Sequence, residues 1–262
     1  MGVVRHGEAL IDLQSVGLVL DGRAILKNVS LQVFPGEVLA LVGPNGAGKS
    51  SVLSVMAGDV AATSGTVALQ GKEVGRYRPE EAARLRAVLM QSNQVSFPFT
   101  VGEIVEMGRA PWGRTPQFLE DDEAIAEALK SADVEHLIER RFSQLSGGEK
   151  ARVSLARVLA QRTPVVLLDE PTAALDLKHQ ETVMRTLRQL ADQGAAVVVV
   201  VHDLSVAAGY SDRVAMIVGG QIDAVGPPRE VIVADRVSAV YGVKVDIEQV
   251  GSPPRPVVLP RR

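Results

Sequence analysis

Eight residues near the start of the chain fit G-x-x-x-x-G-K-[ST], a pattern whose backbone wraps around the phosphates of a nucleotide. The pattern comprises Gly43, Pro44, Asn45, Gly46, Ala47, Gly48, Lys49 and Ser50, and Ser51 adds a second hydroxyl. Its glycines allow successive N–H groups to point at phosphate oxygens. We expect Lys49 to reach the β- and γ-phosphates and the Ser50 hydroxyl to ligate Mg²⁺. A glycine-rich turn with an exposed lysine is the simpler alternative, but the apolar strand before the pattern and the apolar helical segment after it favour phosphate binding.

Two consecutive acids, Asp169 and Glu170, follow the apolar run at residues 165–168. In nucleotide hydrolysis one acid can hold Mg²⁺, and a second acid can orient or deprotonate the attacking water. We expect Asp169 to take the first role and Glu170 the second. Taken alone, an Asp-Glu pair in this position is more often a helix cap or a solvated strand end. The phosphate-binding pattern upstream reverses that preference.

A second glycine-rich segment consists of Leu145, Ser146, Gly147, Gly148 and Glu149, and it precedes a predicted helix. A serine followed three residues later by a glutamate is a capping box, so an ordinary helix start explains the pattern. Helix N–H groups bared by two glycines also form an anion site, suited to a phosphate presented by another molecule. Both interpretations can hold together.

Three short apolar runs rich in β-branched residues lead into residues with reactive side chains or into the phosphate-binding pattern. These runs are 38–42 before Gly43, 165–168 before Asp169, and 197–201 before His202. Such runs, alternating with helical segments, predict a parallel sheet covered on both faces, with ligands beyond the carboxyl ends of the strands. We therefore expect the three residues at one edge of the sheet.

The remaining segments predict the elements around that sheet. Period-two alternation over 9–33 predicts a small antiparallel β region, and 214–218 with 222–225 predicts a hairpin. Near-helical spacing over 121–141 predicts a helix inside a helical insertion. The last twelve residues, 251–262, hold four prolines and three arginines, too little apolar material to pack, so we expect them to be mobile.

Composition narrows the class of protein. The 262 residues are 46% hydrophobic and 23% charged, which excludes disorder for most of the chain. The longest apolar run is the seven residues 195–201, and no secretory signal is visible, so we expect a cytoplasmic chain without a membrane span. The absence of cysteine excludes disulfides and thiolate chemistry. A net charge of −3 gives no chain-wide indication of nucleic-acid binding.

In this order the motifs resemble those of the ATP-binding cassette (ABC) ATPases, the motor subunits of ABC transporters, over residues 9–233. The resemblance implies an α/β fold with a parallel-sheet core of the P-loop NTPase (RecA-like) type, an antiparallel β subdomain and an inserted helical subdomain. It implies a nucleotide-binding core with its β subdomain at 9–91 and 163–235. The helical subdomain would occupy 92–162, and 236–262 would be a partly mobile C-terminal extension.

The resemblance also implies roles for several further residues and for the second glycine-rich segment. Gln91 resembles the glutamine that contacts Mg²⁺ and the catalytic water, and Asp176 lies in a segment that resembles the loop crossing between protomers. His202 resembles the switch histidine that contacts the γ-phosphate. Residues 145–149 resemble the family signature and are called the signature segment below. By itself, a histidine at a strand end is usually an ordinary surface residue.

The family places ATP between two copies of the chain, with the phosphate-binding pattern of one facing residues 146–148 of the other. The resemblance therefore implies a symmetric homodimer that binds ATP and Mg²⁺ at two shared sites. It also implies two membrane-spanning permease subunits, a substrate-binding protein that delivers cargo to the permease, and a peripheral location on the cytoplasmic side of the inner membrane. No nucleic-acid partner is expected.

Residues 97–101, 107–111 and 175–180 resemble the ATPases of bacterial haem (hemin) importers, within a group that also moves ferric siderophores and cobalamin. Haem import is thus the expected function, with siderophore or cobalamin import as the alternative. A soluble cassette ATPase acting on nucleic acid or the ribosome is the alternative of another class. The scattered histidines give no indication that this chain itself binds haem; they are His6, His136, His179 and His202.

Two further positions carry expectations. Leu20 stands where many members of the family have an aromatic residue that stacks on adenine, so we expect base recognition to rest on apolar packing. Phe97 and Phe99 either form an interface with the membrane subunit or pack inside the helical insertion.

Overall fold

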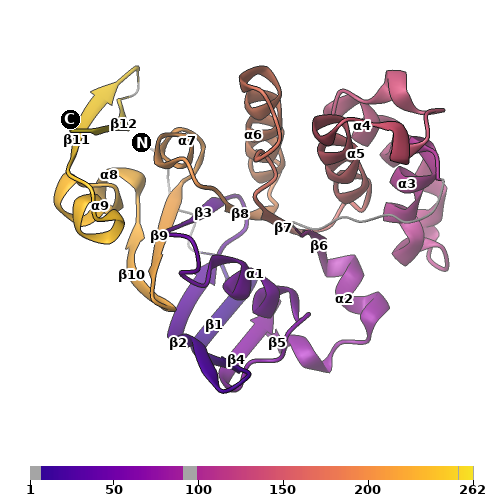
Figure 1. The fold of residues 1–262 in the computed structure, drawn as a ribbon. Coiled ribbons are helices and arrows are strands. Elements are labelled where there is room, and N and C mark those ends of the chain that lie inside the picture. Colours follow the sequence, from indigo (N-terminus) through magenta and orange to yellow (C-terminus); the bar gives the residue numbers. More distant parts are fainter. Residues whose placement is uncertain (1–6, 91–98, 253, 262) are drawn as a thin grey trace.

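The computed structural model describes residues 7–90, 99–252 and 254–261. A central sheet organises the chain, and a group of helices stands at one side of it, at the right of Figure 1. No helix within the described ranges is long and apolar enough to cross a membrane.

The central sheet has six strands in the order β10-β9-β3-β8-β7-β6. They are β3 (Val38–Val42), β6 (Arg86–Leu89), β7 (Val165–Asp169), β8 (Ala196–Val200), β9 (Arg213–Val218) and β10 (Gln221–Gly226). Neighbours are parallel except β10, which runs antiparallel to β9. The parallel pairing of β3, β8 and β7 brings their carboxyl ends to one edge, as the sequence predicted.

A second, antiparallel sheet has the strand order β2-β1-β4-β5. Its strands are β1 (Ile11–Leu20), β2 (Arg23–Val33), β4 (Ser64–Leu69) and β5 (Lys72–Glu73). Asp21 and Gly22 connect β1 to β2 with φ values of 48° and 75°. Positive φ at both turn residues gives a twist that matches a two-residue hairpin. The antiparallel region predicted over 9–33 is confirmed.

Alternate side chains of the central strands fill two cores, one on each face of the sheet. In β3, Val38, Ala40 and Val42 belong to the first core, and Leu39 and Leu41 belong to the second. All five are fully buried. Burial on both faces explains why the strands read as unbroken apolar runs, since each such side chain contributes about 1.5–3 kcal/mol.

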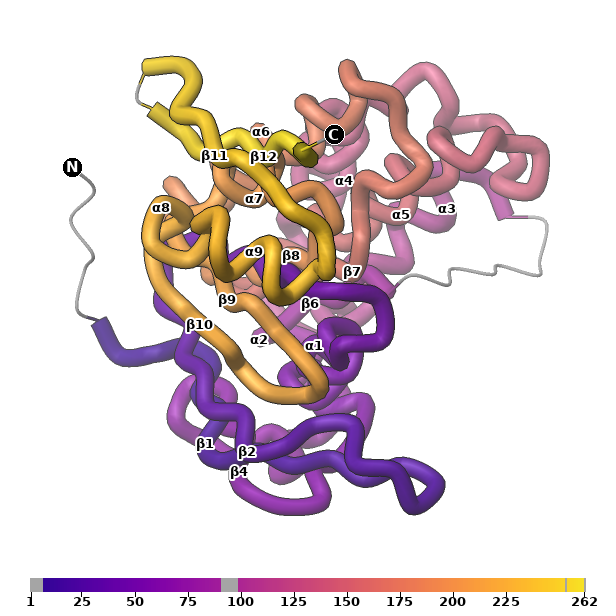
Figure 2. The backbone as a smooth tube through the Cα atoms, turned by 60° about the vertical axis from the view of Figure 1, so that its left-hand side comes forward, coloured from indigo at the N-terminus to yellow at the C-terminus, as the bar shows by residue number. Residues whose placement is uncertain are grey.

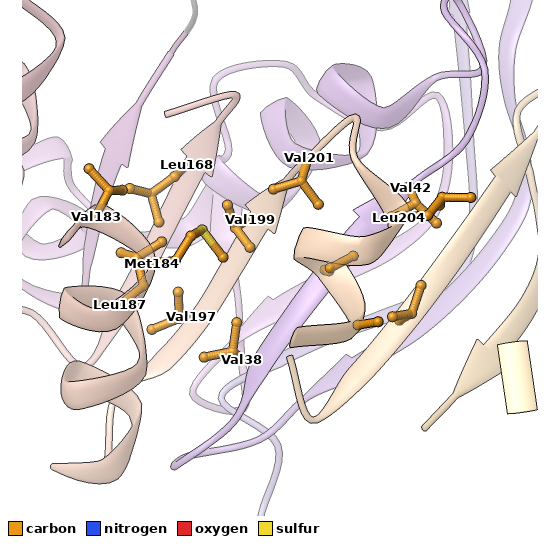
Figure 3. Close-up of a cluster of buried hydrophobic side chains, with 14 of the residues drawn as sticks. Val38, Val42, Leu168, Val183, Met184, Leu187, Val197, Val199, Val201 and Leu204 are labelled. Atoms are coloured by element: carbon orange, nitrogen blue, oxygen red, sulfur yellow. The ribbon is translucent and has the colours of Figure 1, made fainter. Parts of the chain in front are cut away.

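Helices cover the first core and the antiparallel sheet covers much of the second. In Figure 3 Val183 of α6 lies beside Leu168 of β7, and Met184 and Leu187 of α6 lie beside Val199 and Val197 of β8. The helices packed around the sheet and the β region are α1 (Lys49–Ala57), α2 (Pro79–Leu85), α6 (Leu177–Asp192), α7 (Leu204–Tyr210) and α8 (Pro228–Val231), with a 3-10 turn, η1 (Val74–Arg76). The second core joins α1 to β1, β2 and β4.

Residues 99–160, called the helical unit, have a core of their own. Its elements are α3 (Val101–Glu106), η2 (Met107–Trp112), η3 (Pro116–Glu120), α4 (Asp121–Ser131), η4 (Glu135–Leu137), η5 (Phe142–Gln144) and α5 (Gly147–Ala160). α5 also connects the unit to the sheet, because its Leu155 and Val158 belong to the first core. The prediction of one helix over 121–141 is wrong in its extent: α4 ends at Ser131, since Asp133 turns the chain with φ of 53°.

The C-terminal segment, residues 234–261, contains α9 (Ala234–Tyr241), β11 (Val245–Val250) and β12 (Arg255–Pro260). β11 and β12 form an antiparallel hairpin, and Pro256 is buried. The prediction that 251–262 holds too little apolar material to pack is therefore wrong for β12. The tail packs because strand pairing and contact with α7 replace a core of its own.

Candidate functional site

The loop between β3 and α1, residues 43–50, is called the phosphate loop. Its glycines Gly43, Gly46 and Gly48 have φ of 144°, 74° and 105°, values that other residues rarely adopt. A Cβ on Gly43 would lie 2.1 Å from the carbonyl oxygen of Ile217, so no side chain fits there. α1 begins at Lys49, within the last two residues of this segment, which brings its free N-terminal N–H groups to the loop. The loop has the geometry of an anion site.

Lys49 lies inside this loop with only 5% of its surface exposed. Its Nζ donates to the carbonyl oxygens of Gly43 at 2.8 Å and Pro44 at 3.0 Å. Burial lowers the pKa of the Lys49 ammonium, and the nearby carboxylates of Glu170 and Asp169 oppose that shift. The end of β3 and the end of β7 therefore share one electrostatic cluster, as the sequence predicted.

Asp169, the last residue of β7, is 3% exposed. Burial raises the pKa of its carboxyl, although a hydrogen bond with the Ser50 side chain and the charge of Lys49 lower it. Its Oδ1 is buried and has no hydrogen-bond partner in the described ranges. Leaving such an oxygen unpaired is unfavourable, and a hard cation with oxygen ligands would satisfy it. The pair of Ser50 and Asp169 therefore fits Mg²⁺.

Glu170 and His202 come together at the adjacent ends of β7 and β8. The His202 Nε2 lies 2.6 Å from the Glu170 Oε1, and the two side chains are 48% and 13% exposed. Glu170 has φ of 51°, and its backbone N–H donates to the Val200 carbonyl at 3.2 Å. Holding a non-glycine residue in this left-handed backbone conformation costs about 1–3 kcal/mol. Such strained residues cluster at active sites, so the conformation of Glu170 is consistent with a functional position.

The signature segment lies at the start of α5. Ser146 Oγ accepts from the Glu149 N–H at 3.3 Å, and the Ser146 N–H donates to Glu149 Oε2 at 2.7 Å. The Ser146 N–H, and to a smaller extent the Ser146 hydroxyl, hold the pKa of the Glu149 carboxyl below its usual range, and the capping box is confirmed. Leu145 is buried in the helical unit, whereas Ser146 and Gly147 are exposed. The start of α5 thus combines an internal cap with an accessible helix N-terminus.

Asp176 is the N-cap of α6, and its Oδ1 accepts from the His179 N–H at 2.9 Å. The His179 Nδ1 lies 2.7 Å from the same oxygen. The His179 backbone N–H, with a smaller contribution from its ring, lowers the pKa of Asp176. A Cβ on Gly148 would lie 3.3 Å from the Ala174 carbonyl oxygen, so the signature segment and the loop before α6 are neighbours within one chain.

The other residues predicted from sequence have varied surroundings. Asn45 is exposed, Pro44 and Ser51 are half-buried, and Ala47 is buried. Leu20, at the end of β1, is 44% exposed. Gln91 and Phe97 lie outside the described residues.

Phe99 packs against the core of the helical unit. For this residue the packing interpretation is therefore the better one. Arg109, within the haem-importer-like stretch 107–111, is also structural: it is 3% exposed and pairs with Asp121 at 2.6 Å. Its other two nitrogens donate to the carbonyls of Ala160 and Gln117.

Two residues next to the phosphate loop were not predicted from sequence. The Gly220 N–H donates to the Ala47 carbonyl at 2.9 Å, and a Cβ on Gly220 would lie 2.1 Å from the Ile25 carbonyl oxygen. Burial raises the pKa of Tyr241, at the end of α9, and the Gly43 backbone amide opposes that shift. No sequence pattern indicated that either residue lies near the phosphate loop, because a Gly-Gly dipeptide indicates only a turn and Tyr241 lies outside every motif.

Comparison with known proteins agrees with this geometry. Residues 26–173, more than half of the chain, match the family model described as ABC transporter. The hemin import ATP-binding protein HmuV of Rhodococcus jostii is 49% identical over 256 residues, covering 98% of this chain and 88% of that protein. The protein of the same name from Streptomyces coelicolor is 53% identical over 241 residues, covering 92% and 86%.

Solved structures share the fold. A chain from a metal-chelate type ABC transporter in an inward-facing conformation superposes with a TM-score of 0.82 at 23% identity, covering 98% of both chains. A dimeric bacterial ABC transporter cassette superposes with a TM-score of 0.75 at 30% identity, covering 84% of this chain and 99% of that one. The chain therefore belongs to the ABC transporter family, as an ATP-hydrolysing cassette with the P-loop NTPase fold.

Proposed function

We propose that the chain is the ATP-hydrolysing motor of a haem importer and works as a homodimer on two membrane-spanning permease subunits. The observation that carries the proposal is the convergence of Lys49, Asp169, Glu170 and His202 at one edge of the sheet. A buried lysine at the phosphate loop, a carboxylate able to hold Mg²⁺ and a residue able to position water are recurring parts of sites that transfer a phosphoryl group to water.

The phosphate loop would hold the phosphates of ATP through its backbone N–H groups. Lys49 now donates to the carbonyls of Gly43 and Pro44, and it would exchange these acceptors for phosphate oxygens. The exchange is favourable because a phosphate oxygen carries charge and a carbonyl oxygen does not. The ammonium is already buried, so little further desolvation is needed.

Ser50 and Asp169 would hold Mg²⁺, together with Gln91 from the sequence prediction. When bound, the ion would neutralise charge on the β- and γ-phosphate oxygens. The raised pKa of Asp169 supports this role, since a nearby cation would favour the ionised carboxylate that burial disfavours.

Glu170 would orient and deprotonate the attacking water, and His202 would fix the Glu170 carboxylate and contact the γ-phosphate. Their 2.6 Å approach supports a shared role, and the Glu170 side chain is 13% exposed. A positioned general base contributes about 10²- to 10⁴-fold to rate.

A homodimer would complete each site. The exposed N-terminus of α5 at Ser146 and Gly147 would face the γ-phosphate held by the other copy, and the loop that ends at Asp176 would cross between protomers. The proximity of Gly148 to the Ala174 carbonyl supports these two roles, because the signature segment and the loop before α6 are neighbours and can meet the other copy together.

Haem is the proposed cargo because the relatives described above are named hemin import ATP-binding proteins. Import of another metal chelate, a ferric siderophore or cobalamin, is the second candidate, and the metal-chelate transporter with the same fold favours keeping it. The cargo would reach the permease from a substrate-binding protein. The chain itself would be peripheral to the cytoplasmic side of the inner membrane.

Two variants test the catalytic proposal. Lys49→Ala is expected to lose ATP binding, whereas Glu170→Gln is expected to bind ATP, lose turnover about 10²- to 10⁴-fold and accumulate an ATP-bound dimer. Nucleotide binding by calorimetry, phosphate release and size-exclusion chromatography measure the three properties. Normal turnover by Glu170→Gln would remove its assigned role.

The cargo is tested in proteoliposomes that contain the chain and a haem-importer permease with which it co-purifies. A haem-loaded binding protein is expected to stimulate ATP hydrolysis and haem uptake. Ferric siderophore or cobalamin with their own binding proteins serve as matched controls. Stimulation by one of these instead of haem would overturn the proposed cargo and leave the motor function intact.

A further inference from the structure

The C-terminal hairpin, formed by β11 and β12, packs on α7, the helix that follows His202. Figures 1 and 2 both show the hairpin beside this helix. The Val258 N–H of β12 donates to the Ser205 Oγ of α7 at 3.3 Å, and both residues are half-buried. The last strand of the chain is thereby bonded to the helix that begins next to the candidate catalytic pair.

The outer edge of β12 offers this hydrogen bond at a single position. The Val258 N–H points away from β11 toward α7, and alternation along a strand makes residues 256 and 260 face the same way. Both are proline, which has no N–H. Ser205 therefore accepts the one outward N–H within residues 255–260. A slip of the hairpin by two residues would place a proline opposite Ser205, so this contact fixes the register between hairpin and helix.

The first turn of α7 is also bonded to the residue next to His202. Asp203 is the N-cap of α7, and its Oδ1 accepts from the Ser205 N–H at 2.7 Å. On the other side of His202, the N–H of the buried Val201 donates to the Leu41 carbonyl of β3 at 3.2 Å. Two exposed residues, His202 and Asp203, thus connect the sheet to the cap. The place of α7 on the sheet therefore decides where the imidazole lies.

We propose that Ser205 is a positioning residue for His202. Its hydroxyl binds the C-terminal hairpin and its N–H binds the cap beside His202. The hairpin thereby holds the first turn of α7 where the His202 Nε2 lies 2.6 Å from the Glu170 Oε1. The inference rests on the proposed catalytic role of Glu170 and His202. Small misplacements of a catalytic group reduce the rate strongly, so a restraint on α7 contributes to turnover.

Ser205→Ala removes the hydroxyl and keeps the N–H that Asp203 binds, so the cap of α7 stays intact. We expect kcat for ATP hydrolysis, measured by phosphate release, to fall about two- to tenfold, the worth of one net hydrogen bond. KM for ATP is expected to stay unchanged, because the phosphate loop is untouched. Ser205→Thr keeps the hydroxyl and is expected to restore kcat. A normal kcat in Ser205→Ala would overturn the inference.

Ser211→Ala is the matched control, because the Ser211 hydroxyl donates to the Ala207 carbonyl of the same helix. The variant removes a hydroxyl at the other end of α7, where its hydrogen bond stays within the helix. Its kcat and KM for ATP are expected to be unchanged. An equal loss of kcat in Ser211→Ala and Ser205→Ala would show a general effect on α7 and would contradict a specific role of Ser205.

A double variant separates positioning from a general loss of structure. If Ser205 acts through His202, Ser205→Ala is expected to add no further loss to that of His202→Ala in single-turnover hydrolysis. Losses that multiply would mean that the two residues act independently, which also overturns the inference. Normal turnover by His202→Ala alone would instead contradict the proposed catalytic role of His202, a result distinct from a normal kcat in Ser205→Ala.

Discussion

The two glycine-rich segments of the chain use glycine for different reasons. In the phosphate loop, Gly43 has φ of 144° and a Cβ would meet the Ile217 carbonyl oxygen at 2.1 Å. In the signature segment, Gly147 is the first residue of α5, and a Cβ there would meet nothing within 4 Å in the described part of the chain. The fold of this chain requires the first glycine and does not require the second.

The difference indicates whether each segment finds its contacts within its own chain or in another molecule. The phosphate loop is braced by its own chain, through Lys49 below it and Gly220 beside it. Ser146 and Gly147 are exposed, and the hydrogen bonds of the capping box stay within the segment. An exposed helix N-terminus with a glycine that the fold does not require allows an anion from another molecule to approach closely. In the proposed homodimer this anion would be the γ-phosphate held by the other copy.

Gly43→Ala is expected to have the largest effect. A methyl group cannot fit beside the Ile217 carbonyl, and alanine at φ of 144° is strained, so we expect a loss of about 3 kcal/mol or more of unfolding free energy. Urea unfolding followed by circular dichroism measures it. A variant as stable as the parent chain would show that the loop can be rebuilt without glycine, and the contrast with the signature segment would disappear.

Gly147→Ala is the counterpart in the signature segment. Stability is expected to stay within about 0.5 kcal/mol, because alanine suits a helix and has space there. ATP turnover is expected to fall at least about tenfold, or 1.4 kcal/mol in barrier, since the methyl group would obstruct the phosphate of the other copy. Calorimetric ATP binding by the monomer serves as the control and is expected to be normal. Unimpaired turnover would argue against a shared site.

Ser146→Ala measures what the capping box contributes to the fold. Loss of the Ser146 Oγ acceptor is expected to cost about 1 kcal/mol at neutral pH in urea unfolding. The Ser146 backbone N–H, which the variant keeps, is the main cause of the lowered pKa of Glu149, and the Ser146 hydroxyl adds to it. The hydroxyl's contribution is present above the ordinary value of 4.5 and is lost as pH falls through the lowered value. The difference between the two proteins is therefore expected to shrink below that pH. A difference that grows in acid would contradict this account.

Asp169→Asn tests how much the burial of a charged carboxylate beside the phosphate loop lowers the stability of the nucleotide-free protein. Burial raises the pKa of Asp169. The free energy of unfolding is therefore expected to fall as pH rises from the ordinary value of 3.8 to the raised value, because the buried carboxyl must then be charged. The amide carries no charge, and the nucleotide-free variant is expected to unfold at a higher temperature at neutral pH. The gain is expected to vanish as pH falls toward the ordinary value of 3.8. A lower midpoint at neutral pH would show that the Ser50 and Lys49 contacts outweigh burial.

Much of the fold was predictable because its signals are local. β3, β7 and β8 are apolar runs buried on both faces, and their pattern shows in the sequence. The end of α4 at Ser131 was missed because apolar spacing continued while the backbone turned at Asp133. β12 was missed because its stability comes from pairing with β11 and packing on α7, which composition does not reveal.

By itself the sequence determined the residue types and spacing of the site: a phosphate loop after one strand, an Asp-Glu pair after another and a histidine after a third. These follow from backbone conformation and from residues a few positions apart. Only the tertiary structure decided that Glu170 and His202 lie 2.6 Å apart and that Gly220 supports Ala47. Such contacts join residues far apart in the chain, and strand order and helix packing, rather than spacing in sequence, bring them together.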